Sequence, residues 1–137
     1  MHAPSSQLRR IMSACSPEPG RRAVAVVDDD ENVRVGMGNL MKAIGFDVEL
    51  FESAAALLAG DLGRFSCILS DMQMPGMSGL DLQRELSRRV PTLPIIFITG
   101  YPDQRVREVA LAGGALGFFE KPCDIEELVS AIELAHS

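Results

Sequence analysis

Four apolar, strand-like runs of this chain each end at polar residues that can take part in chemistry. The run VAVV ends at the aspartates 28–30, CILS ends at Asp71, PIIFI ends at Thr99, and GFFE is followed by Lys121. Short, continuous apolar runs are typical of strands buried in a parallel sheet. Parallel strands present their carboxyl ends at one edge, where open α/β sheets bind their ligands. The order of these runs and of the polar residues after them therefore predicts a crevice with three carboxylates, a hydroxyl and an ammonium group.

Five predicted strands alternate with predicted helices beyond residue 22. The strands are expected at 24–27, 47–51, 67–70, 95–98 and 117–120, and the helices at 31–44, from 53 to near 60, 80–90, 103–112 and after 124. This alternation predicts an α/β fold, a single-domain parallel sheet with helices on both faces. In the first helix, Leu40 and Met41 are expected on the buried face, and Gly36 and Gly38 each weaken it by about 1 kcal/mol.

Composition limits the classes of function. With 137 residues, nearly half of them apolar, the chain is long enough for one domain with a core. A net charge of −6 argues against direct nucleic-acid binding, which needs a basic face. No apolar run is long enough to span a membrane or to act as a signal peptide, and three cysteines without a CxxC pair indicate reduced thiols. We expect a cytoplasmic protein with a flexible tail over residues 1–21.

The acidic run has both an ordinary and a functional interpretation. Carboxylates are common at helix N-termini, and Asp30 fits that role. Asp28 and Asp29 directly follow a strand, where a crevice is expected and where like charges repel. A hard divalent cation, which prefers oxygen ligands, would relieve that repulsion.

Taken together, the segments VVDDD, SDMQMPGMSG, IFITG and FFEKP resemble the receiver domain of bacterial two-component response regulators. The resemblance extends over about residues 22–137, and SAAALL, ITG and EKP are most similar to receivers of the FixJ type. It implies a flavodoxin-like fold, with five parallel strands in the order 2-1-3-4-5.

The resemblance also implies roles for individual residues. Asp71 matches the phosphoryl acceptor, and Lys121 matches the lysine that pairs with a phosphoryl oxygen. Mg²⁺, or Mn²⁺, would be held by Asp28, Asp29, Asp71 and the backbone carbonyl of Gln73. A carboxylate nucleophile of this kind forms an aspartyl phosphate.

Three further positions match residues that act after phosphoryl transfer. Thr99 matches the hydroxyl that turns toward the phosphoryl group, and Phe118 matches the aromatic switch residue. Gln73 and Tyr101 match positions that tune dephosphorylation. Cys123 departs from the family, which usually has Phe at that position.

The partners implied by the resemblance are a sensor histidine kinase or a phosphotransfer protein. A homodimer through the fourth helix, fifth strand and fifth helix is also compatible with it, and no contact with a membrane or nucleic acid is expected. The protein would not be a classical enzyme, because its activities would be self-phosphorylation and self-dephosphorylation. The sequence does not decide between a stand-alone receiver and a fragment of a longer regulator.

Three other interpretations stay open. A haloacid-dehalogenase-like phosphohydrolase would use Asp28 as its nucleophile, although Asn32 departs from that motif. A flavodoxin-like binding module would need a phosphate-binding first loop, which three aspartates would repel. A pseudo-receiver would keep the site residues and serve only for docking.

Overall fold

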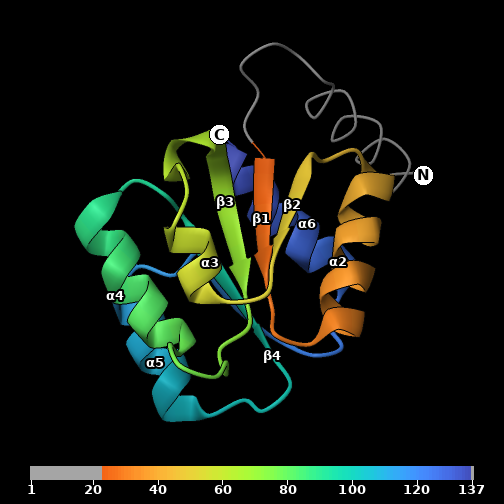
Figure 1. The fold of residues 1–137 in the computed structure, drawn as a ribbon. Coiled ribbons are helices and arrows are strands. Elements are labelled where there is room, and N and C mark those ends of the chain that lie inside the picture. Colours follow the sequence, from red (N-terminus) through yellow and green to blue (C-terminus); the bar gives the residue numbers. More distant parts are fainter. Residues whose placement is uncertain (1–22, 137) are drawn as a thin grey trace.

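Five parallel strands alternate with five helices in the computed structural model, which describes residues 23–136 (Figure 1). The tail predicted over residues 1–21 lies outside the described part, as does Cys15. The elements are β1 (Ala23–Val27), α2 (Glu31–Ile44), β2 (Val48–Phe51), α3 (Ala54–Leu58), the 3₁₀ turn η1 (Leu62–Arg64), β3 (Phe65–Ser70), α4 (Gly79–Arg89), β4 (Ile95–Thr99), α5 (Gln104–Ala112), β5 (Gly117–Glu120) and α6 (Ile125–His136).

The strands form one sheet in the order β2-β1-β3-β4-β5, which confirms the predicted topology. The register places Val27 beside Ser70 and Thr99 beside Glu120. The chain therefore leaves β1, β3, β4 and β5 at the same edge of the sheet. The polar residues that follow these strands are gathered at that edge.

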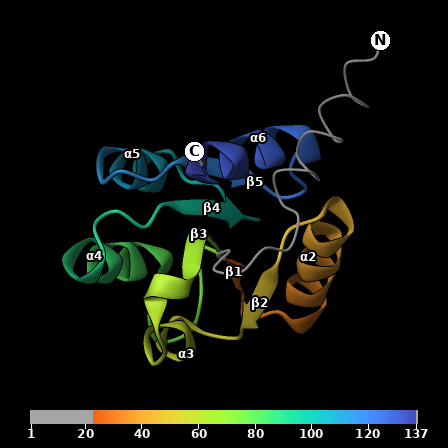
Figure 2. The ribbon, with the colours of Figure 1, turned by 90° about the horizontal axis from the view of Figure 1, so that it is seen from above.

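Helices cover both faces of the sheet. The view along the sheet shows α3, α4 and α5 on one face and α2 and α6 on the other (Figure 2). Because the strands are buried on both sides, the inward side chains form two apolar clusters. One cluster includes Leu57, Ile68, Leu82, Leu86 and Phe97, and the other includes Met41, Leu69, Ile96, Leu128 and Ile132.

Short polar side chains cap the N-termini of the helices. Asp30, Ser53 and Asp103 each accept hydrogen bonds from backbone N–H groups in the first turn of the helix that follows. Ser78 and Asp81 form a reciprocal capping box at the start of α4. Asp124 accepts from the N–H groups of residues 126 and 127. These caps satisfy helix donors that would otherwise lack partners.

The first helix differs from the prediction at one position. Met41 is fully buried, but Leu40 is 40% exposed. Helix α2 lies close to the sheet at Gly38, where an added Cβ would lie 2.7 Å from a methyl group of Leu50. Leu40 therefore lies at the rim of the contact instead of inside it. Within residues 23–136, no helix is long and apolar enough to cross a membrane.

Candidate functional site

The loop between β1 and α2 holds Asp28 in a fixed position. Asp28 is 4% exposed, and its Oδ1 accepts a hydrogen bond of 2.9 Å from the backbone N–H of Asp30. The guanidinium of Arg34, one turn into α2, donates to the backbone carbonyl of Asp28 at 2.8 Å. Asp29 is exposed and free to turn toward the crevice. Asp30 serves as the helix cap, which confirms its predicted role.

The end of β3 holds Asp71 beside the end of β1. The backbone N–H of Asp71 donates to the carbonyl of Val27 at 2.9 Å, and the Ser70 hydroxyl donates to the carbonyl of Asp71 at 2.8 Å. The N–H of Gln73 lies 3.5 Å from Asp71 Oδ1, near the limit of a hydrogen bond. In the same loop, Met72 is buried.

The three carboxylates predicted at the crevice lie close together in the structure. Asp28, Asp29 and Asp71 each offer a carboxylate oxygen, and these atoms all lie within 4.8 Å of one another. Lys121, from the loop after β5, places its Nζ 3.0 Å from Asp28 Oδ2 and 3.8 Å from Asp71 Oδ2. This donor set fits a metal ion that prefers oxygen ligands, because three hard, anionic oxygens converge and the ammonium of Lys121 pairs with only two of these carboxylates.

The environment of Asp71 raises the pKa of its carboxyl group. Burial is the main cause, because it penalises the charged form, and the negative charge of Asp28 adds to it. The ammonium of Lys121 and the backbone N–H groups of Gln73 and Met72 lower the pKa in part. Asp71 is therefore a poorly solvated carboxylate whose ionised form depends on nearby positive charge.

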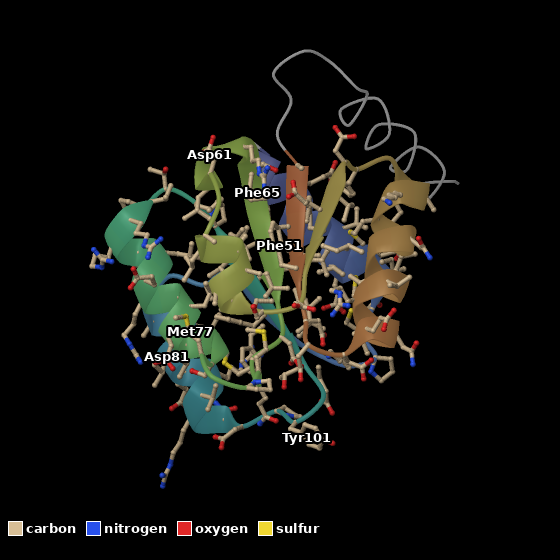
Figure 3. The ribbon with its side chains drawn as sticks, viewed as in Figure 1. Phe51, Asp61, Phe65, Met77, Asp81 and Tyr101 are labelled. Atoms are coloured by element: carbon tan, nitrogen blue, oxygen red, sulfur yellow. The ribbon has the colours of Figure 1, made fainter. Side chains whose placement is uncertain are left out.

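Thr99 and Tyr101 lie in the loop after β4. Thr99 is completely buried, and its Oγ1 accepts a hydrogen bond of 3.1 Å from the backbone N–H of Tyr101. The carbonyl of Thr99 accepts from the N–H of Lys121 at 2.8 Å. Tyr101 is 75% exposed and lies at the carboxyl edge of the sheet (Figure 3). The Lys121–Pro122 peptide bond is cis.

Phe118 lies in β5, paired in register with Phe97. Its side chain is 8% exposed, and the centroids of the two rings are 6.4 Å apart. The guanidinium carbon of Arg107, on α5, lies 5.9 Å from the centroid of the Phe118 ring. This contact and the bond from Arg34 to Asp28 were not predicted, because each joins a long helical side chain to a backbone or ring outside the helix.

Comparisons with known proteins place these observations in a family. The family model described as "Response regulator receiver domain" matches residues 24–133. The chain is 41% identical over 114 residues to the response regulator protein TmoT of Ectopseudomonas mendocina, covering 82% of this chain and 51% of that protein. It is 35% identical over 113 residues to the transcriptional regulatory protein FixJ of Bradyrhizobium diazoefficiens, covering 82% of this chain and 55% of that protein. The chain thus spans about half the length of the curated relatives it matches.

Solved structures agree with this result. The FixJ-N crystal structure is 36% identical, with a TM-score of 0.76, and the match covers 83% of this chain and 92% of that one. A response regulator receiver domain protein from Clostridium thermocellum is 26% identical, with a TM-score of 0.78, covering 83% and 93% of the two chains.

Proposed function

The chain belongs to the response regulator receiver domain family, and on that premise we propose that Asp71 is its phosphoryl acceptor. The observation that carries this proposal is the position of Asp71 within reach of two other carboxylates and of Lys121. Phosphoryl transfer depends mainly on positioning and on neutralising charge, and this site can do both.

The proposed reaction is a displacement at phosphorus. A carboxylate oxygen of Asp71 forms a new P–O bond while the P–N bond to the donor histidine breaks, and the imidazole leaves with the electron pair. Lys121 Nζ lies 3.8 Å from Asp71 Oδ2, so it can pair with a phosphoryl oxygen attached there.

We propose that Mg²⁺, or Mn²⁺, is held by Asp28, Asp29, Asp71 and the carbonyl of Gln73. When bound, the ion neutralises charge on the carboxylates and on the transferring oxygens. Asp28 is already oriented by the N–H of Asp30 and paired with Lys121. Asp29 is exposed, so it can change its rotamer on binding at little cost.

The proposed response to phosphorylation begins at Thr99. In the structure its hydroxyl oxygen accepts a hydrogen bond from the backbone N–H of Tyr101. After phosphorylation the hydroxyl would leave this N–H and donate to a phosphoryl oxygen. Drawing that loop inward would change the packing of Phe118 and the surface formed by α5, β5 and α6. A partner protein, or a second copy of the chain, would bind that surface. Gln73 and Tyr101 flank the site and would tune the lifetime of the phosphoryl group.

The remaining assignments rest on the family. We propose that a histidine kinase or a phosphotransfer protein supplies the phosphoryl group, in the cytoplasm. We further propose that the receiver occupies residues 22–137, which the family match over residues 24–133 supports. Self-phosphorylation and self-dephosphorylation would be its only catalytic activities.

Intact-mass spectrometry after incubation with acetyl phosphate tests the proposal. The wild type is expected to gain one phosphoryl group when Mg²⁺ is present and none in EDTA. Asp71→Asn is expected to gain none under either condition, because the nucleophilic oxygen is replaced by an amide nitrogen. Exposed Asp61 lies before β3, at the opposite end of that strand from Asp71, and provides a control: Asp61→Asn should match the wild type.

Two results would contradict the proposal. No adduct on the wild type would favour a receiver fold that serves only for docking. An adduct that persists in Asp71→Asn but disappears in Asp28→Asn would favour Asp28 as a nucleophile of the haloacid-dehalogenase kind.

A further inference from the structure

Arg34 holds the backbone of the loop between β1 and α2 from inside the helix that follows it. Its Nη1 donates a hydrogen bond of 2.8 Å to the backbone carbonyl of Asp28, six residues earlier. Arg34 lies in the first turns of α2, and its own N–H donates to the carbonyl of Asp30 at 2.9 Å. Side chains on a helix lean toward its N-terminus, so a long side chain at this position can reach back to the loop.

The start of a helix is an unfavourable place for a positive charge. The helix dipole favours anions there, and α2 indeed begins with Asp30 and Glu31. Between residues 23 and 136, no carboxylate forms an ion pair with Arg34. The hydrogen bond to the carbonyl of Asp28 is therefore the contact that accounts for the direction of this side chain.

The two cations that contact Asp28 do so at different atoms. Lys121 Nζ lies 3.0 Å from Asp28 Oδ2 and 3.8 Å from Asp71 Oδ2, so it shares the carboxylate oxygens with any bound cation. Arg34 contacts only the main-chain oxygen of Asp28. It can therefore fix the loop without competing with a metal ion for the carboxylates.

This loop needs to be held against electrostatic repulsion. Oxygens of three carboxylates, those of Asp28, Asp29 and Asp71, lie within 4.8 Å of one another, and like charges so close repel when no cation is bound. Both backbone groups of Asp28 have partners, since its N–H donates to the carbonyl of Phe51 at 3.1 Å and its carbonyl accepts from Arg34. Without Arg34, the carbonyl side of Asp28 would lose its bond, and the peptide that leads to Asp29 could turn away.

We propose that Arg34 is a positioning residue that holds the loop between β1 and α2 in its cation-binding arrangement before Mg²⁺ binds. The inference rests on the proposed function, in which Asp28 and Asp29 hold the ion. The apparent affinity for a ligand falls with the fraction of molecules in the competent arrangement, and Arg34 raises that fraction. Its charge alone has the opposite effect, because it repels a cation. The sign of the change on removing Arg34 thus separates positioning from simple electrostatics.

The first test is a calorimetric titration of Mg²⁺ at constant ionic strength. Arg34→Met, which keeps an unbranched apolar stem, is expected to weaken the affinity about three- to tenfold through loss of one charge-assisted hydrogen bond. Arg34→Lys can still donate to the carbonyl and should recover part of the loss. Lys42→Met removes the same charge from the exposed last turn of α2 and should bind as the wild type does. Equal or tighter binding by Arg34→Met would overturn the inference.

The second test uses the metal-free protein. In EDTA, Arg34→Met is expected to accelerate the exchange with water of the amide protons of Asp28 and Asp30, measured by NMR, by a similar factor. The first of these donates to Phe51 and the second to Asp28 Oδ1. The amide of Leu116, which donates to Ile95 at the other end of β4, should keep its rate. Unchanged exchange at the two loop amides, or an equal acceleration at Leu116, would show that Arg34 does not act on the loop.

The outcomes separate the two proposals. If the wild type binds Mg²⁺ and Arg34→Met binds it equally well, the role of Arg34 is wrong and the proposed function stands. If the wild type binds no Mg²⁺, the proposed function fails, and the exchange rates in EDTA still decide whether Arg34 holds the loop.

Discussion

Asp71, the proposed phosphoryl acceptor, illustrates how a residue placed for chemistry can lower stability. Its pKa is raised from the usual 3.8, first by burial and then by the charge of Asp28. A carboxyl group with a raised pKa in the folded state favours folding below its unfolded pKa. That contribution is lost as the pH rises through the folded pKa. At neutral pH without metal, ionised Asp71 therefore destabilises the domain.

Neutralising this residue should stabilise the metal-free protein. In EDTA at pH 7, Asp71→Asn is expected to raise the free energy of unfolding by about 1 kcal/mol, as substitutions at strained functional sites commonly do. The difference from the wild type should shrink as the pH falls, because protonation neutralises the wild-type carboxyl group as well. Urea denaturation of both proteins at pH 7, 6 and 5 measures this difference in the free energy of unfolding.

Asp81 provides a control, because its substitution should change the stability in the opposite direction. Its pKa is lowered, mainly by hydrogen bonds from Ser78 in the capping box of α4. Asp81→Asn should therefore reduce stability at pH 7, by an amount that decreases as the pH falls through the lowered pKa. An Asp71→Asn variant that is less stable than the wild type at pH 7 in EDTA would contradict the account of Asp71.

At the scale of the elements, two helical glycines have opposite roles. A Cβ at Gly79, in the first turn of α4, would lie 2.9 Å from the backbone Cα of Met72 and 2.9 Å from the ring of Phe97. A Cβ at Gly36, in α2, would meet nothing within 4 Å. Close packing of α4 against the end of β3 requires the first glycine, whereas no close contact requires the second.

Alanine substitutions should reveal this difference. Gly79→Ala is expected to lower the free energy of unfolding by about 1–3 kcal/mol, because the added methyl group overpacks the loop that carries Asp71. Gly36→Ala is expected to raise it by up to about 1 kcal/mol through helix propensity. Chemical denaturation of both variants checks the pair. Equal changes of the same sign would show that backbone propensity, and not the contact at Met72, governs both positions.

The same glycines show what a sequence can predict at this scale. Strand ends converge in any parallel sheet, so the grouping of Asp28, Asp71 and Lys121 followed from the order of the apolar runs. Gly36 and Gly38, in contrast, look alike in the sequence, and only packing distinguishes them. A Cβ at Gly38 would lie 2.7 Å from a methyl group of Leu50, whereas a Cβ at Gly36 would meet nothing within 4 Å. The contact between Arg107 and Phe118 also depends on how closely α5 approaches β5, which no local pattern specifies.

At the scale of the whole molecule, the proposed metal site at the acidic edge would couple cation binding to folding. The carboxylates at this edge come from the ends of β1 and β3, neighbouring strands that belong to both apolar clusters. The site therefore exists only when the sheet is assembled, and a cation that binds it stabilises the entire domain by mass action. Neutralising repulsion among three converging carboxylates adds to that effect.

Mg²⁺ should therefore raise the melting temperature of the wild type in a saturable way. At a Mg²⁺ concentration 100-fold above its dissociation constant, the gain in unfolding free energy is expected to be about 2.7 kcal/mol. Asp29→Asn and Asp71→Asn should each lose most of it, since each removes an anionic ligand, while exposed Glu108→Gln should keep it. Calorimetric scans at constant ionic strength, with choline chloride balancing the salt, measure the effect. An equal gain in Asp29→Asn would place the cation elsewhere, because a general charge effect would not distinguish Asp29 from Glu108.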